Sequence, residues 1–161
     1  MKTTDANDTF LVTTPSDREI VMTRRLNAPR ALAFDAFTKP ELIRRWLLGP
    51  DGWSMPVCDV DLKAGGTLRY RWRSDADGTE FGIEGTYREV AAPERIVHVE
   101  AMDGFPGEAV VTTTFEERDG ATTVTMTCLY ESRAIRDIAV ESGMATGVAT
   151  SFDRLADVLA A

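Results

Sequence analysis

The chain has 161 residues, of which 43% are hydrophobic and 27% charged, a composition typical of soluble globular proteins. Its length suits one domain, which can bury roughly 70% of the surface of the unfolded chain. The formal net charge of −8 at pH 7 repels phosphate overall and counts against nucleic acid as a partner. No apolar run reaches the roughly 18 residues that predict a membrane span. Residues 1–17 lack the basic start and apolar core of a signal peptide, so we expect a cytoplasmic protein.

The beginning of the chain predicts a tail followed by a strand. Residues 1–16 are polar and rich in Thr and Asp, and we expect a flexible N-terminal tail there, with a short strand as an option at residues 10–13. A single domain is then expected over residues 17–161. Its first strand is predicted at residues 18–26, where the side chains alternate between two faces.

Two short helices are predicted next. Asn27 and Pro29 are typical of a helix start, and apolar residues follow on one side of the predicted helix. Pro40 opens the second helix, which stops at Gly49 and the proline after it.

The rest of the chain predicts six strands and then helix. The strand segments, separated by short turn sequences, are residues 54–63, 67–74, 79–90, 95–102, 108–118 and 121–131. Short connections of this kind favour antiparallel neighbours. A short helix over residues 132–141 and a longer amphipathic helix after Gly143 close the chain.

These elements predict an α+β fold with a curved, seven-stranded antiparallel sheet. The apolar face of such a sheet needs a cover, and only the last helix is long enough to lie across it. We therefore expect the sheet to wrap around the long C-terminal helix. The two short helices, between the first and second strands, would close one end and leave room for a cavity.

Residues 65–78 interleave arginines with aromatic residues, as a nucleic-acid-binding surface does. Side chains of a strand alternate between its faces, so Tyr70 and Trp72 point one way and Arg69, Arg71 and the next arginine the other. Burying three unpaired guanidinium groups would cost more free energy than burying the aromatic rings gains. We therefore expect the aromatic rings beneath the helix and the arginines in water.

Four stretches of the sequence, in order and spacing, match a known family. They are APRALAFDAFTKPELIRRW (28–46), GWSMPVCDVDLKAGGTLRYRW (52–72), DGTEFGIEGTYREVAAPERIV (77–97) and SGMATGVATSFDRLADVLA (142–160). The chain thereby resembles the START-like (SRPBCC, helix-grip) superfamily, in particular the domain homologous to the activator of the heat-shock-protein-90 ATPase. The resemblance implies a seven-stranded sheet around a C-terminal helix with an apolar pocket. The superfamily includes lipid and hormone carriers, polyketide cyclases, aromatases and proteins that protect against reactive natural products.

A pocket between sheet and helix predicts a small hydrophobic or aromatic molecule as the ligand. Strand alternation, helix spacing and the resemblance together give these candidate pocket residues: Trp46, Tyr70, Trp72, His98, Glu100, Met126, Met144, Val148 and Phe152. Trp46 suits either a gate at the pocket mouth or a packed corner, and we favour the corner.

The orientation of His98 and Glu100 has two alternatives. If Val97 and Val99 face the helix, the histidine and the glutamate are exposed on the outer face. If Ile96 faces the helix, the two form a polar handle in an apolar pocket. In related sequences the position matching His98 is usually apolar or aromatic, which favours the inward orientation.

The sequence contains no nucleophile elbow, phosphate-binding glycine loop or metal-ligand spacing, so we expect no cofactor and no metal. No group of residues requires the protein to be an enzyme, and a non-enzymatic ligand-binding protein is the favoured interpretation. Cys58 and Cys128 are expected as buried free thiols. An enzyme of the cyclase, aromatase or hydrolase type, using His98 or Glu100 with Tyr70 or Tyr87, is one alternative. A co-chaperone-like module with a chaperone partner and a role in the stress response is another. Long sheet edges also make a homodimer one of the expected states.

Overall fold

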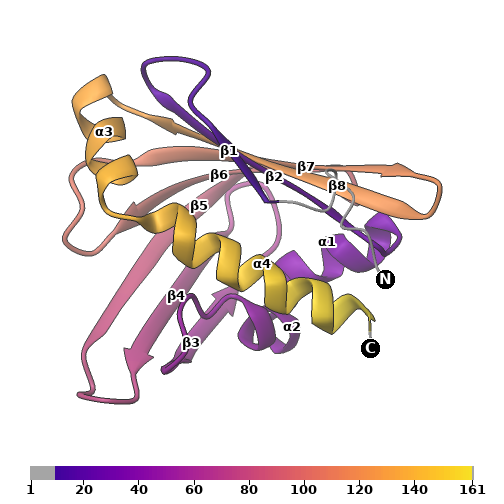
Figure 1. Cartoon of the computed structure of the whole chain (residues 1–161), viewed down its shortest axis with the longest axis horizontal. Helices are drawn as coiled ribbons and strands as arrows, with labels where there is room; N and C mark the ends of the chain where they lie inside the picture. Colours follow the sequence, from indigo (N-terminus) through magenta and orange to yellow (C-terminus); the bar gives the residue numbers. More distant parts are fainter. Residues whose placement is uncertain (1–9, 161) are drawn as a thin grey trace, which may run out of the picture.

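The structure is a computed structural model and describes residues 10–160 (Figure 1). Within that range the chain forms eight strands and four helices. In chain order they are β1 (Leu11–Thr13), β2 (Glu19–Leu26), α1 (Arg30–Thr38), α2 (Pro40–Trp46), β3 (Trp53–Val60), β4 (Thr67–Ser74), β5 (Glu80–Ala91), β6 (Arg95–Met102), β7 (Ala109–Arg118), β8 (Ala121–Tyr130), α3 (Arg133–Glu141) and α4 (Met144–Ala160).

All eight strands form one antiparallel sheet in the order β1-β2-β8-β7-β6-β5-β4-β3. The sheet is not closed, since β1 and β3 lie at its two ends. The α+β class, the antiparallel sheet and the helix at the C-terminus are as predicted. The predicted number of seven strands is wrong, because β1 adds an eighth.

The extra strand, β1, lies in the stretch predicted as a tail, at the place where a short strand was an option. Leu11 pairs with Thr23 of β2, and all three residues of β1 are exposed. Because no side chain of β1 is buried, its sequence shows no alternation of apolar and polar residues. Residues 1–9 of the predicted tail lie outside the described residues.

The long helix α4 lies along one face of the sheet, with α1 and α2 beside its C-terminal half (Figure 1). Its contacts are with α1, α2, α3 and β2. The sheet twists strongly, so β3 and β4 run at a steep angle to β7 and β8 (Figure 1). A sheet with this twist diverges from a straight helix, which separates α4 from the middle strands.

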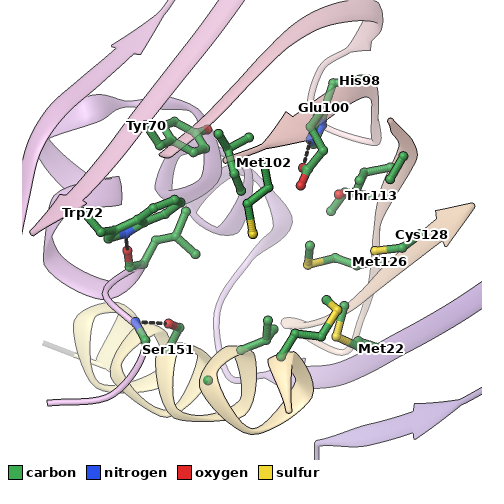
Figure 2. A pocket seen from close by; sticks show the side chains of 18 of the residues that line it. Met22, Tyr70, Trp72, His98, Glu100, Met102, Thr113, Met126, Cys128 and Ser151 are labelled. Atoms are coloured by element: carbon green, nitrogen blue, oxygen red, sulfur yellow. Dashed lines mark hydrogen bonds and ion pairs between the residues drawn. The ribbon is translucent and has the colours of Figure 1, made fainter. Parts of the chain in front are cut away.

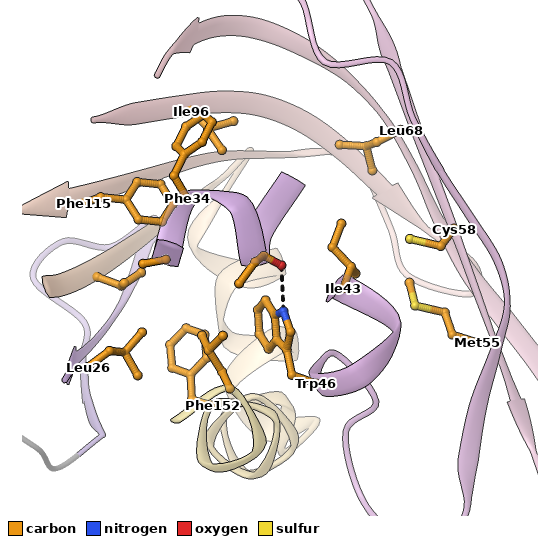
Figure 3. Close-up of a cluster of buried hydrophobic side chains, with 14 of the residues drawn as sticks. Leu26, Phe34, Ile43, Trp46, Met55, Cys58, Leu68, Ile96, Phe115 and Phe152 are labelled. Carbon is orange, nitrogen blue, oxygen red and sulfur yellow. Dashed lines mark hydrogen bonds between the residues drawn. The ribbon is translucent and has the colours of Figure 1, made fainter. Parts of the chain in front are cut away.

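The packed part of the core lies where α1 and α2 fill the space between α4 and the sheet. Its aromatic rings meet edge to face or tilted: Phe37 lies 4.7 Å from Trp46 and 5.2 Å from Phe115, and Trp46 lies 5.7 Å from Phe152, between ring centroids. The indole Nε1 of Trp46 donates to the carbonyl oxygen of Ala36 at 2.8 Å (Figure 3). Trp46 is only 2% exposed, so it is a packed corner residue.

The alternation predicted for residues 65–78 is confirmed in β4. Leu68 and Trp72 are buried on the helix side. On the other face, Arg69 pairs with Glu84 of β5 at 3.4 Å and Arg71 with Asp103 at 3.1 Å. The arginines therefore form an ion-paired outer surface on the back of the strand that carries Tyr70 and Trp72.

Candidate functional site

A cavity of about 460 Å³ lies between the N-terminal half of α4 and the inner face of strands β4 to β8. Its wall also includes α2 and the loop that follows it. All nine candidate pocket residues line this cavity: Trp46, Tyr70, Trp72, His98, Glu100, Met126, Met144, Val148 and Phe152. The structure thus brings them together around one space. That they bind a ligand stays a prediction.

Aromatic rings from two neighbouring strands form one wall of the cavity. Trp72 lies opposite Phe81 in the β4–β5 register, and their rings stack with centroids 5.2 Å apart. Tyr70 meets Trp72 edge to face at 5.9 Å. The Trp72 indole Nε1 donates to the carbonyl oxygen of Leu47 at 2.7 Å, which satisfies its polar group and leaves its ring available for apolar contact.

His98 and Glu100 form a polar pair on β6 that faces the cavity (Figure 2). Of the two orientations left open by the sequence, the structure has the inward one. The imidazole Nε2 lies 2.7 Å from Glu100 Oε1, and the side chains are 15% and 23% exposed. A carboxylate oxygen can only accept a hydrogen bond, so His98 Nε2–H is the donor to Glu100 Oε1.

Close approach of β5 and β6 beside this pair depends on a glycine. Gly85 lies opposite Glu100 in the sheet register. A Cβ atom at residue 85 would collide with the carbonyl oxygen of Val99. The absence of a side chain therefore lets the two strands pair at the position from which Glu100 projects.

The tyrosines near the polar pair are neutral hydrogen-bonding groups. Burial raises the pKa of Tyr70 well above its usual value, and the Glu100 carboxylate adds to that shift. Burial also raises the pKa of Tyr87 to about 12. At neutral pH both phenols therefore keep their protons, and neither can accept a proton as a general base.

Sulfur-containing side chains form the wall opposite Trp72. Met22, Met126 and Cys128 lie together there (Figure 2). The Tyr130 hydroxyl donates to the Met144 Sδ at 3.4 Å. Burial raises the pKa of Cys128 to about 12, so it stays a thiol and behaves as a small apolar group. Flexible, polarisable side chains of this kind adapt to ligands of different shape.

The loop after α2 closes one side of the cavity and is held by α4. The Gly49 amide donates to Ser151 Oγ at 2.8 Å. Arg154 donates to the Gly49 carbonyl oxygen at 2.5 Å and pairs with Asp51 at 2.7 Å. Together with the bond from Trp72 to Leu47, these contacts attach the loop to both the helix and the sheet.

Sequence reasoning missed part of the cavity wall. Phe81 and Ile83 line it from β5, and the alternation argument used for β4 would have found them. Leu48 and Pro50 line it from the loop, where no periodic pattern marks inward residues.

The described part of the chain contains neither a metal-ligand cluster nor a helix suited to crossing a membrane. Within residues 10–160, no three His, Cys, Asp or Glu side chains gather as a metal site requires. None of the helices in the described part of the chain has the length and apolar content that a membrane crossing needs.

Solved structures share this fold over nearly the whole chain. A Rhodobacter sphaeroides protein is 28% identical, with a TM-score of 0.89, over 94% of this chain and 97% of that one. A Staphylococcus epidermidis protein is 27% identical, with a TM-score of 0.78, over 91% of this chain and 92% of that one. An Aeromonas hydrophila protein described as AHSA1-like is 20% identical and supports the fold alone, with a TM-score of 0.64, over 84% of this chain and 91% of that one.

The family assignment comes from the sequence itself. A search of curated proteins found no match. Residues 27–160, from the end of β2 to the end of α4, match the family described as Activator of Hsp90 ATPase homolog 1-like protein. Since this match spans most of the chain, the protein belongs to the family of Activator of Hsp90 ATPase homolog 1-like proteins.

Proposed function

We propose that the protein binds a small hydrophobic or aromatic molecule in the cavity between the sheet and α4. The observation that carries the proposal is the cavity itself: about 460 Å³, bounded mainly by aromatic, aliphatic and sulfur-containing side chains. Binding pockets for small molecules have volumes of roughly 300–1,000 Å³ and walls of this kind. Ordinary protein interiors leave few voids larger than a water molecule.

The candidate residues divide into walls and anchors. Trp72, Tyr70 and Met126 offer apolar surface from the sheet, and Met144 and Val148 offer it from α4. Trp46 and Phe152 border the cavity on the side of the packed core.

The His98–Glu100 pair provides hydrogen-bonding groups that orient a ligand. Cys58 and Cys128 are buried free thiols, which suit a reducing compartment. We therefore propose that the protein acts in the cytoplasm.

A second candidate function is acid–base turnover of the bound molecule. His98, Glu100 and Tyr70 face the same cavity, which is the convergence that such chemistry requires. Turnover would appear as chemical change of a bound compound. Replacing His98 by Gln, which cannot exchange a proton at neutral pH, would abolish that change without releasing the compound.

The experiment that tests binding is native mass spectrometry of the freshly purified protein, followed by thermal shifts with aromatic and lipid-like compounds. A molecule that binds only the folded state raises the melting temperature. We expect a co-purifying mass or a compound-dependent shift. The proposal is contradicted if no small molecule co-purifies with the protein and no compound raises its melting temperature.

A matched pair of variants separates cavity binding from surface binding. Val148→Phe adds a ring to the cavity wall, whereas Val140→Phe adds the same ring to an exposed position of α3. We expect the first change to abolish the thermal shift and the second to preserve it. Equal shifts in both variants would mean that the compound binds elsewhere.

A further inference from the structure

The charge of the cavity wall is unbalanced. Among the described residues that line it there is no lysine or arginine, and Glu100 is the single carboxylate. His98 is the one histidine among the described residues of that wall. A ligand carboxylate or phosphate would therefore meet a carboxylate and no permanent cation. Fatty acids and other anionic lipids are a poor match for this wall.

One oxygen of Glu100 is available to a ligand. Oε1 accepts from His98 Nε2, and among residues 10–160 the glutamate side chain has no other hydrogen-bond partner. Within residues 10–160, Arg24 Nε is the one side-chain nitrogen or oxygen atom that is fully buried and has no hydrogen-bond partner. Glu100 Oε2 also has no partner but is not fully buried. It faces the open space of the cavity (Figure 2).

The surroundings of this oxygen favour a hydrogen-bond donor with positive charge. A carboxylate in apolar surroundings gains most from a charged donor, because charge-assisted hydrogen bonds are roughly twice as strong as neutral ones. The ring faces of Trp72 and Tyr70 border the same space and attract cations through their electron-rich faces. Burial is the main cause of the raised pKa of Tyr70 and of Cys128, and the charge of Glu100 adds to both shifts.

We propose that the cavity selects hydrophobic amines, whose ammonium group donates to Glu100 Oε2 while the hydrocarbon part lies against the aromatic and methionine walls. This inference rests on the proposed function and deepens it, because it names the chemical class of the ligand. His98 acts as a positioning residue: its Nε2–H holds Oε1, which leaves Oε2 directed into the cavity.

Three probes with one skeleton test the selection: 2-(1-naphthyl)ethylamine, 2-(1-naphthyl)ethanol and 1-naphthaleneacetate. Their dissociation constants are measured on the full chain at pH 7 by calorimetry. We expect the amine to bind roughly tenfold more tightly than the alcohol, and the acid to bind most weakly. Because this ranking is measured on the unaltered protein, it does not depend on any variant folding.

Glu100→Gln is the decisive variant, since it keeps the shape and an acceptor oxygen but removes the charge. We expect it to bring the amine and the alcohol to within about threefold of each other. Glu84→Gln is the matched control, because Glu84 lies on the outer face of the neighbouring strand, paired with Arg69. It should leave all three affinities unchanged.

The outcomes separate this inference from the broader proposal. If the alcohol or the acid binds as tightly as the amine, amine selection is overturned while hydrophobic ligand binding stands. If Glu100→Gln folds and keeps the amine preference, Glu100 is not the recognition group and the inference is overturned. If none of the probes binds, amine selection fails, and native mass spectrometry with the compound panel decides the broader proposal separately.

Discussion

The two halves of the space beneath α4 differ in what fills them. Around the C-terminal half of the helix, α1 and α2 fill the gap to the sheet, and Phe115, Phe152 and Leu155 are at most 1% exposed. Around its N-terminal half, Met144 and Val148 are only partly buried and border the cavity. One helix and one sheet thus serve two purposes: the packed half stabilises the fold, and the hollow half offers space for a ligand.

The largest difference between the two halves is expected when the same substitution is made in each. Phe115→Ala removes a ring from the packed half and should lower the free energy of unfolding by about 3–5 kcal/mol. Phe81→Ala removes a half-buried ring that lines the cavity, and we expect a loss of about 1–2 kcal/mol because fewer contacts disappear. Chemical denaturation measures both, and equal losses would contradict the division into halves.

Alkaline pH should weaken both halves through their buried thiols. Burial raises the pKa of Cys58, in the packed core, to about 11 and that of Cys128, on the cavity wall, to about 12, from a model-peptide value of 9.0. Because the pKa of each thiol is higher in the folded protein than in the unfolded chain, its contribution to the free energy of unfolding is fully present below pH 9. That contribution is lost as the pH rises toward the pKa of the thiol in the folded protein. Each thiol then contributes a loss of up to about 1.4 kcal/mol per pH unit.

Denaturation at pH 8, 9, 10 and 11 measures this slope, and serine variants assign it to each half. Serine does not ionise in this range, so Cys58→Ser and Cys128→Ser should each make the decline above pH 9 less steep. An unchanged slope in Cys128→Ser would mean that the Cys128 thiol of the unaltered protein ionises as readily in the folded state as in the unfolded chain. This outcome would contradict the burial of Cys128.

The smallest effect is expected on the outer face, which belongs to neither half. Arg69 pairs with Glu84 at 3.4 Å, but the two side chains are 50% and 74% exposed. Exposed ion pairs contribute little, so Arg69→Gln should change the free energy of unfolding by less than about 0.5 kcal/mol and leave ligand binding unaffected. A loss comparable to that of Phe81→Ala would show that the outer face is part of the stabilising core.

The sequence predicted most of the fold because the relevant patterns are local. Alternation in β4 identified Tyr70 and Trp72 as inward residues, and helix spacing in α4 identified Met144 and Val148. The sequence favours a strand at residues 10–13 only as an option, because the three residues of β1 are exposed and carry no pattern of buried side chains.

The orientation of His98 could not be predicted from β6 alone. In the sequence, apolar residues lie on both faces of the strand, Val97 and Val99 on one and Ile96 on the other, so alternation alone does not decide which face is buried. The facing is fixed by pairing with β5, whose register shifts between Tyr87 and Glu89. A bulge of this kind moves side chains between faces and depends on contacts far apart in the chain.

The hydrogen bond from the Gly49 amide to Ser151 Oγ offers a natural sensor of the cavity. Exchange of this amide hydrogen with deuterium requires the loop to leave α4, even briefly. Leu48 and Pro50, on either side of Gly49, form part of the cavity wall, so a molecule packed against them would restrain the same movement. Slower deuterium uptake at one backbone position would therefore report occupancy of the cavity, without a label on the protein or the ligand.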